Sequence, residues 1–173
     1  MVIRWCVNDF YEGENVYRFL PCTAFHKTTS ALEIILDKIS DPYEIYSVLS
    51  ERLAPYFYYD NLKLLLEKHK ELLSTKGQTD QEKKRDQKCM DDLLISKARL
   101  SGTKKEEIEL LIDYGANPQV EHSYDGGGSI LDTLVQNNNF EAFKFVLQKT
   151  GTIASSHNTA EHSMYWWLEK MLS

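Results

Sequence analysis

The sequence predicts an all-α protein built of stacked helical hairpins. Apolar residues recur at helical spacing in several segments, whereas no segment sustains the alternation of apolar and polar residues that marks a half-buried strand. One short amphipathic stretch, Glu106–Pro118, also matches a second stretch, Glu141–Gly151, at an offset of 35 residues up to Leu147. A unit repeated at about this length is typical of stacked-repeat architectures.

Size and composition indicate one soluble globular domain. The chain has 173 residues, of which 42% are hydrophobic and 27% charged, and this is enough to form a hydrophobic core. No apolar run approaches the ~20 residues that span a bilayer, and the N-terminus lacks the basic and apolar regions of a signal peptide. Three cysteines are too few and too scattered for a disulfide framework. We therefore expect a cytoplasmic protein without a membrane span.

The net charge of −6 is distributed unevenly. Residues 61–105 contain 12 Lys and Arg against 7 Asp and Glu, so this segment carries +5 and the remainder carries −11. A basic segment can bind nucleic acid, but this one contains no aromatic residue to stack on a base, and acidic residues are interleaved throughout. The pattern favours solvated helix faces over a nucleic-acid surface.

The two ends of the chain are predicted to be caps around the repeats. Residues 1–27 are aromatic-rich without a repeat and are interpreted as an irregular N-terminal cap. Residues 159–173 place apolar side chains on one helical stripe and predict a C-terminal capping helix. The repeats are expected within 28–158, with an irregular middle at 54–105.

The first hairpin is predicted between Thr28 and Leu53. Ser30 and Glu33 have the spacing of a capping box that opens one helix. Asp41 followed by Pro42 provides an N-cap acceptor and a proline at the first position of a second helix, which the apolar stripe extends to Leu53.

The irregular middle lacks the repeat spacing, and we expect either lengthened helices or an irregular insert. Pro55 ends the preceding helix, and a strong helix is predicted over Asn61–Leu73. The polar segment Ser74–Asp80 is the clearest loop, and a helix resumes near Gln81 and continues to about Leu100.

The repeated stretch itself begins with Thr103 and Glu106, which have capping-box spacing, and it closes at Gly115, which can adopt a positive φ. A 14-residue segment, 115–128, then leads to a helix within Ser129–Asn139. Four apolar residues are expected to be buried between the hairpins: Leu110, Leu111, Val146 and Leu147.

These hairpins resemble ankyrin repeats, each of which is a turn followed by two antiparallel helices. The Gly115-Ala116-Asn117-Pro118 turn carries the resemblance, and Ser30–Ile35 is similar to the Thr-Pro-Leu-His opening of an ankyrin first helix. Asp132 stands where that histidine belongs, so stacking is expected to be less regular. The resemblance covers about half of the chain. It implies a protein-binding module, and short degenerate members resemble effectors that intracellular bacteria and viruses deliver into host cytosol.

In ankyrin repeats the projecting hairpin finger and the concave face of the first helices bind partners. The resemblance assigns 115–128 to the finger and implies a partner protein with a basic or mixed polar face. Nine residues of this chain fall on that surface: Asn117, Gln119, Glu121, His122, Tyr124, Asp125, Asp132, Thr133 and Gln136.

Tyr56, Phe57, Tyr58 and Tyr59 form an aromatic run with two interpretations. The aromatic side chains either cover a seam within the fold or form an exposed patch that anchors a partner.

Catalytic and cofactor patterns are weak. Gly126–Gly128 lacks the Lys-Ser/Thr that completes a phosphate-binding loop, so no cofactor is predicted. Cys22, His26, His157 and His162 lack the tight spacing of zinc ligands, and no metal is predicted. The alternative function is a cysteine-dependent host-modifying enzyme, which requires Cys22 or Cys89 beside a histidine in a cleft.

Overall fold

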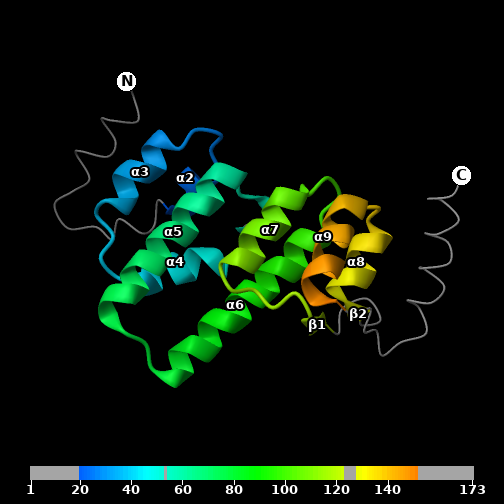
Figure 1. Cartoon of the computed structure of the whole chain (residues 1–173). Helices are drawn as coiled ribbons and strands as arrows, with labels where there is room; N and C mark the ends of the chain where they lie inside the picture. The colour runs from blue at the N-terminus through cyan, green and yellow to red at the C-terminus, as the bar shows by residue number, and fades with distance from the viewer. Residues whose placement is uncertain (1–19, 53, 123–127, 152–173) are drawn as a thin grey trace, which may run out of the picture. The chain divides into compact units, whose positions relative to one another are not determined.

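The computed structural model describes residues 20–52, 54–122 and 128–151, and helices make up 69% of this part of the chain (Figure 1). The prediction of a mainly helical protein is therefore confirmed. The contacts group the chain into two units, 1–89 and 90–173, where the sequence predicts one domain. The boundary falls within one helix, α6 (Asp80–Ala98), so that each unit contains part of it.

The N-terminal unit contains α2 (Leu20–Ala24), α3 (Ser30–Leu36), α4 (Pro42–Leu49), the 3-10 helix η2 (Ala54–Tyr56), α5 (Tyr59–Lys76) and the first half of α6. Helix α5 packs against α4 and α3, and α2 packs against the same two helices. The largest fully buried side chains here are Phe57 and residues of α2, α3, α4 and α5: Leu20, Leu32, Ile35, Ile45, Leu49, Leu62, Leu65 and Leu66. The irregular segment 54–58 therefore contributes to the same core as the helices.

Local start signals were correct for α4 but not for α3. The Asp41 carboxylate accepts a hydrogen bond from the backbone N–H of Tyr43 at 3.2 Å, and Pro42 is the first helical residue, as predicted. The capping box at Ser30 is wrong, because Ser30 is already inside α3 and the N-cap residue Thr29 makes no side-chain cap bond. Helix α4 also ends at Leu49, before the predicted end at Leu53.

The segment predicted as an irregular middle contains two long helices, of 18 and 19 residues. The expected helix over Asn61–Leu73 lies within α5, and the predicted loop is shorter because α5 continues to Lys76 and α6 begins at Asp80. Gly77, at φ 70°, ends α5. The start of α6 is a capping box in which Glu82 Oε2 accepts from the Thr79 N–H at 2.7 Å, while Thr79 Oγ1 accepts from the Glu82 N–H at 3.3 Å. The Thr-x-x-Glu spacing could have placed this boundary.

The C-terminal unit contains the second half of α6, α7 (Lys105–Asp113), the strands β1 (Glu121–His122) and β2 (Gly128–Ser129), α8 (Ile130–Gln136) and α9 (Phe140–Thr150). The strands pair antiparallel, with Glu121 opposite Ser129, and α9 packs against both α7 and α8. Helices α7 and α9 begin 35 residues apart, in agreement with the sequence offset.

The turn after α7 also forms as predicted. Gly115 has φ 105°, its N–H donates to the Ile112 carbonyl, and the Ala116 N–H donates to the Leu111 carbonyl, both at 3.0 Å. This is the paired hydrogen-bond pattern with which a glycine ends many helices. It directs the chain away from α7 and toward β1.

The predicted capping box at the start of α7 is wrong by one residue. Helix α7 begins at Lys105, and the Glu107 carboxylate accepts from the backbone N–H of Lys104 at 2.9 Å. Thr103 instead donates its hydroxyl to the carbonyl of Lys97 at 2.7 Å, near the end of α6. The Thr103 side chain is therefore bonded to the end of α6, although its local spacing predicts a cap on α7.

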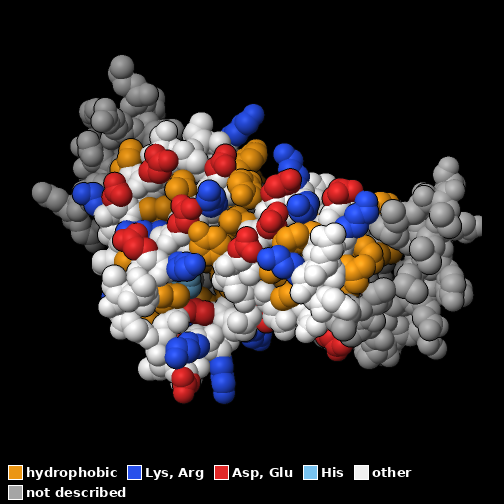
Figure 2. Space-filling view, in the orientation of Figure 1, with side chains coloured by type: hydrophobic (Ala, Val, Ile, Leu, Met, Phe, Trp, Pro, Cys, Tyr) orange, Lys and Arg blue, Asp and Glu red, His pale blue; other side chains and the backbone are white. Residues whose placement is uncertain are grey.

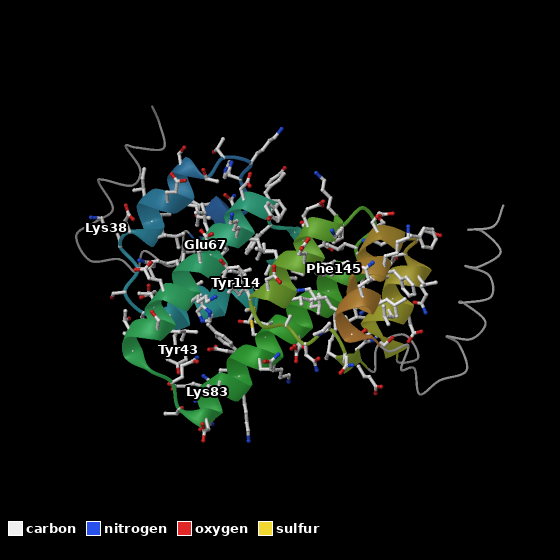
Figure 3. The ribbon with its side chains drawn as sticks, in the orientation of Figure 1. Lys38, Tyr43, Glu67, Lys83, Tyr114 and Phe145 are labelled. Atoms are coloured by element: carbon white, nitrogen blue, oxygen red, sulfur yellow. The ribbon has the colours of Figure 1, made fainter. Side chains whose placement is uncertain are left out.

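Three of the four predicted core residues of the repeated stretch are buried. Leu110, Leu111 and Val146 are enclosed, whereas Leu147 is half-buried. Phe145 is also buried, and the ammonium groups of Lys105 and Lys149 lie 5.4 and 5.6 Å from its ring centroid (Figure 3). The seam between α7 and α9 thus combines an apolar centre with charged groups at its edge.

Candidate partner-binding surfaces

The finger predicted from the sequence is anchored at its base. The Asn117 N–H donates to Asp91 Oδ1 of α6 at 2.7 Å, and the Asn117 side-chain oxygen accepts from the Gln119 N–H at 3.0 Å. These two bonds hold the chain between Gly115 and β1 against α6. The side chains of Asn117, Gln119 and Glu121 are exposed, so these three predicted contact residues are accessible.

His122 connects this hairpin to α8. Its ring Nε2 lies 2.8 Å from the hydroxyl oxygen of Thr133, and the side chain is half-buried. The Thr133 hydroxyl also lies 3.2 Å from the carbonyl of Ser129, to which it donates. His122 therefore positions the base of the finger and presents only part of its ring to solvent.

Asp132 and Thr133 require a correction, because both side chains point into the unit. They are only 8% and 4% exposed. Asp132 Oδ2 accepts from the backbone N–H and from the hydroxyl of Ser129, each at 2.8 Å, while Ser129 Oγ accepts from the Asp132 N–H at 3.2 Å. Asp132 thus completes the capping box of α8, and the Ser-x-x-Asp spacing was the available signal.

Gly128 is required beside this capping box. Its φ of 150° is a conformation that side-chain-bearing residues rarely adopt, and an added Cβ would lie 3.3 Å from Asp132 Oδ2. Gln136 lies at the other end of α8 and is exposed, as predicted. The remaining predicted contacts, Tyr124 and Asp125, lie outside the described residues.

A second exposed surface lies in the N-terminal unit, where the aromatic run divides between core and solvent. Phe57 is fully buried, but Tyr56 and Tyr58 are 55% and 49% exposed, and Tyr59 is 37% exposed. Phe25, from the turn after α2, is 50% exposed. We refer to Phe25, Tyr56, Tyr58 and Tyr59 as the tyrosine patch. Hydrophobic side chains are visible on the surface near the N-terminal end of α5 in Figure 2.

Asn61 fixes the two backbone segments that carry the tyrosine patch. Its side chain is fully buried in the first turn of α5, and its amide nitrogen donates to the carbonyls of Thr23, Ala24 and His26. The bond to Ala24 is 3.0 Å long. Because Phe25 lies between two of these carbonyls, its backbone is held against the start of α5. The patch thus lies on anchored backbone.

Two cysteines lie among the described residues. Cys89 is buried, and Cys22 is exposed on α2, the short helix before Phe25. Within residues 20–52, 54–122 and 128–151, no group of three or more His, Cys, Asp and Glu side chains is arranged to hold a metal ion. His157 and His162 lie outside these ranges.

Comparison of the chain with protein-family models, with curated proteins and with solved structures finds no match. Among the helices that the structure describes, none is long and apolar enough to cross a membrane. The two exposed surfaces are therefore the candidate functional sites.

Proposed function

We propose that this chain is a non-enzymatic protein-binding module built of ankyrin-like helical hairpins. The 35-residue spacing of α7 and α9 supports the repeat interpretation, as does the order of elements in the C-terminal unit: a helix pair, a small hairpin, then a second helix pair. The repeat resemblance covers about half of the chain and implies a protein-binding role, and we propose this role for the whole chain.

Contacts between the two helix-connecting turns support a stacked arrangement. Asn137 Nδ2 donates to the Ala98 carbonyl at 3.0 Å, and Asn139 Nδ2 donates to the Thr103 carbonyl at 2.7 Å. The turn between α8 and α9 therefore lies on the turn between α6 and α7. Such nearest-neighbour contacts hold successive units together in repeat proteins.

The tyrosine patch is the surface that we propose as the main partner contact, and its exposure is the observation that carries the proposal. Large aromatic side chains are costly to leave in water, and clustered exposed aromatics mark interaction sites. Tyrosine is enriched among the few residues that dominate binding energy, since it buries a large area with little loss of rotamer entropy. The backbone anchored by Asn61 reduces the ordering cost of binding.

The finger is the second part of the proposed surface. Asn117, Gln119, Glu121 and Gln136 are exposed, and Tyr124 and Asp125 belong to the same hairpin in sequence. This set is rich in amides and acids, so it suits a partner with a basic or mixed polar face. Asp132 and Thr133 are excluded from the surface because they are buried.

A cross-linking and affinity experiment tests this function. A photoreactive amino acid replaces Tyr58 in one full-length variant, Gln119 in a second and Gln148 on α9 in a control. Partners captured from cell lysate are identified, and their binding is then measured with purified proteins. We expect specific cross-links at Tyr58, fewer at Gln119 and none at Gln148.

Substitution measures the energetic contribution of the patch. Changing Tyr56 and Tyr58 together to Ala should weaken binding at least tenfold, since one aromatic hot spot contributes ~2 kcal/mol or more. Circular dichroism melting should change little because both side chains are exposed. If affinity survives this change but falls in Tyr124→Ala/Asp125→Ala, the finger is the main surface. If no protein is captured specifically at either position, the proposed function is wrong.

A further inference from the structure

A buried histidine lies between α5 and α6 in the N-terminal unit. The His69 side chain is only 6% exposed, and its Nε2 lies 3.9 Å from Asp86 Oδ1 on α6. That distance is too long for a hydrogen bond, and within the described residues this nitrogen has no hydrogen-bond partner. Asp86 Oδ2 accepts instead from the side-chain amide of Gln78, in the turn that joins the two helices. The imidazole is therefore enclosed beside a carboxylate that is bonded to another group.

The connection between these helices is short. Helix α5 ends at Lys76 and α6 begins at Asp80, with Gly77 at φ 70° in the turn. The Tyr43 hydroxyl of α4 donates to Glu82, in the first turn of α6 (Figure 3). The first half of α6 is thus attached to the rest of the unit through side chains at its start and through the His69 contact one turn later.

Among the residues that the structure describes, the charge that acts on the imidazole is that of Asp86. The neighbouring helices also carry other titratable side chains: Asp80, Glu82, Lys83, Lys84, Arg85, Lys88 and Cys89 in the first half of α6, Tyr43, Glu44 and Tyr46 on α4, and Glu33 on α3. Of the described residues, Asp86 is the one whose charge favours the protonated ring, and burial opposes it. The balance between these two effects decides what happens when the ring takes up a proton.

We propose that His69 is a pH-sensitive latch that holds the first half of α6 against α5 while its imidazole is neutral and releases it on protonation. A neutral ring fills the buried space at little electrostatic cost. A charged ring must be solvated. Because Asp86 Oδ1 lies 3.9 Å from the ring, beyond hydrogen-bond distance, and Gln78 holds the other oxygen of that carboxylate, separation of the helices supplies the solvation.

The direction of the pKa shift agrees with this latch. Burial lowers the pKa of His69 below its usual value of 6.5, and Asp86 only partly opposes this. Because the folded-state pKa is the lower one, the contribution of the latch to stability is fully present above pH 6.5. It decreases as the pH falls below 6.5 and through the folded-state pKa, since the open form binds the proton more tightly.

Two measurements on the full-length chain test the latch. Histidine ring signals are followed by NMR from pH 8 to pH 4.5. Amide exchange of 80–89, corrected for the intrinsic pH dependence, is compared at pH 7.5 and pH 5. We expect His69 to titrate below the usual histidine value of 6.5, and exchange in 80–89 to accelerate several-fold at pH 5.

Variants separate the latch from general acid effects. His69→Phe keeps a buried ring without a titrating group and should abolish the acid-dependent acceleration, whereas His26→Gln should leave it unchanged. Asp86→Asn should lower the His69 titration midpoint further. A His69 midpoint above 6.5 overturns the proposal, as does acceleration that is equal in His69→Phe and the wild-type chain. If His69→Phe fails to fold, the wild-type midpoint alone decides.

Discussion

Asn139 joins the two helical hairpins of the C-terminal unit, and its replacement tests whether they are stacked as described. Its side-chain oxygen accepts from the Ala142 N–H at 3.3 Å and caps α9, while its amide nitrogen donates to the Thr103 carbonyl at 2.7 Å. One side chain therefore makes a local bond and a bond between hairpins. Suitable substitutions can remove the two separately.

The expected cost follows from these two bonds. Asn139→Ala removes the cap, which is worth ~1 kcal/mol, and leaves the carbonyl of the buried Thr103 without this donor, at a cost of about 1–3 kcal/mol. The total loss of unfolding free energy is then about 2–4 kcal/mol. Asn139→Asp keeps a capping oxygen but loses the donor, so it should cost about 1–3 kcal/mol.

Equilibrium urea unfolding of the full-length chain, followed by circular dichroism at 222 nm, measures these changes. Gln148→Ala, on the exposed face of α9, is the matched control and should lie within about 0.5 kcal/mol of the wild-type chain. If Asn139→Asp is as stable as the wild-type chain while Asn139→Ala loses only ~1 kcal/mol, the bond to Thr103 contributes nothing. That result would refute the argument that the turns hold the hairpins together.

Two further predictions concern charged groups. Lys97 is buried and pairs with the half-buried Glu107 between α6 and α7, so Glu107→Gln should cost about 3–5 kcal/mol in urea unfolding. Lys97→Met/Glu107→Gln keeps an acceptor for the Lys104 N–H and should recover most of this loss; an equal loss in both variants argues against the pair. Hydrogen bonds from Tyr43 and from Thr79 lower the pKa of Glu82 from 4.5 to about 2. The ionised Glu82 carboxylate therefore contributes fully to stability above pH 4.5, and this contribution is lost as the pH falls through about 2. Carboxyl NMR should therefore show Glu82 titrating near pH 2, and Tyr43→Phe should raise its midpoint; an ordinary midpoint near 4.5 in the wild-type chain contradicts the bond.

Local contacts and contacts between elements affected the predicted binding residues differently. Asn117, Gln119 and Glu121 are exposed, and the segment that holds them is marked in the sequence by a glycine and a proline. The family resemblance assigns Asp132 and Thr133 to the same surface, but both are buried: Asp132 accepts from the Ser129 N–H, and Thr133 donates its hydroxyl to the Ser129 carbonyl. The repeat interpretation and the partner stay predictions.

The sequence by itself determined features whose causes lie within a few residues. Asp41 and Pro42 start α4, Gly115 ends α7, and the 35-residue offset appears as the spacing of α7 and α9. Capping bonds, positive φ and apolar periodicity act within one or two helical turns, so each of them can be recognised from neighbouring residues.

Tertiary structure alone decided how side chains with equivalent local patterns were used. In the aromatic run, Phe57 enters the core while Tyr56 and Tyr58 face solvent, and Asn61 holds the start of α5 against a turn more than 30 residues earlier in the chain. Thr103 likewise has capping-box spacing, yet its hydroxyl donates to the end of α6. In each case a partner distant in sequence or on another helix determines where the side chain goes, and the local pattern contains no information about that partner.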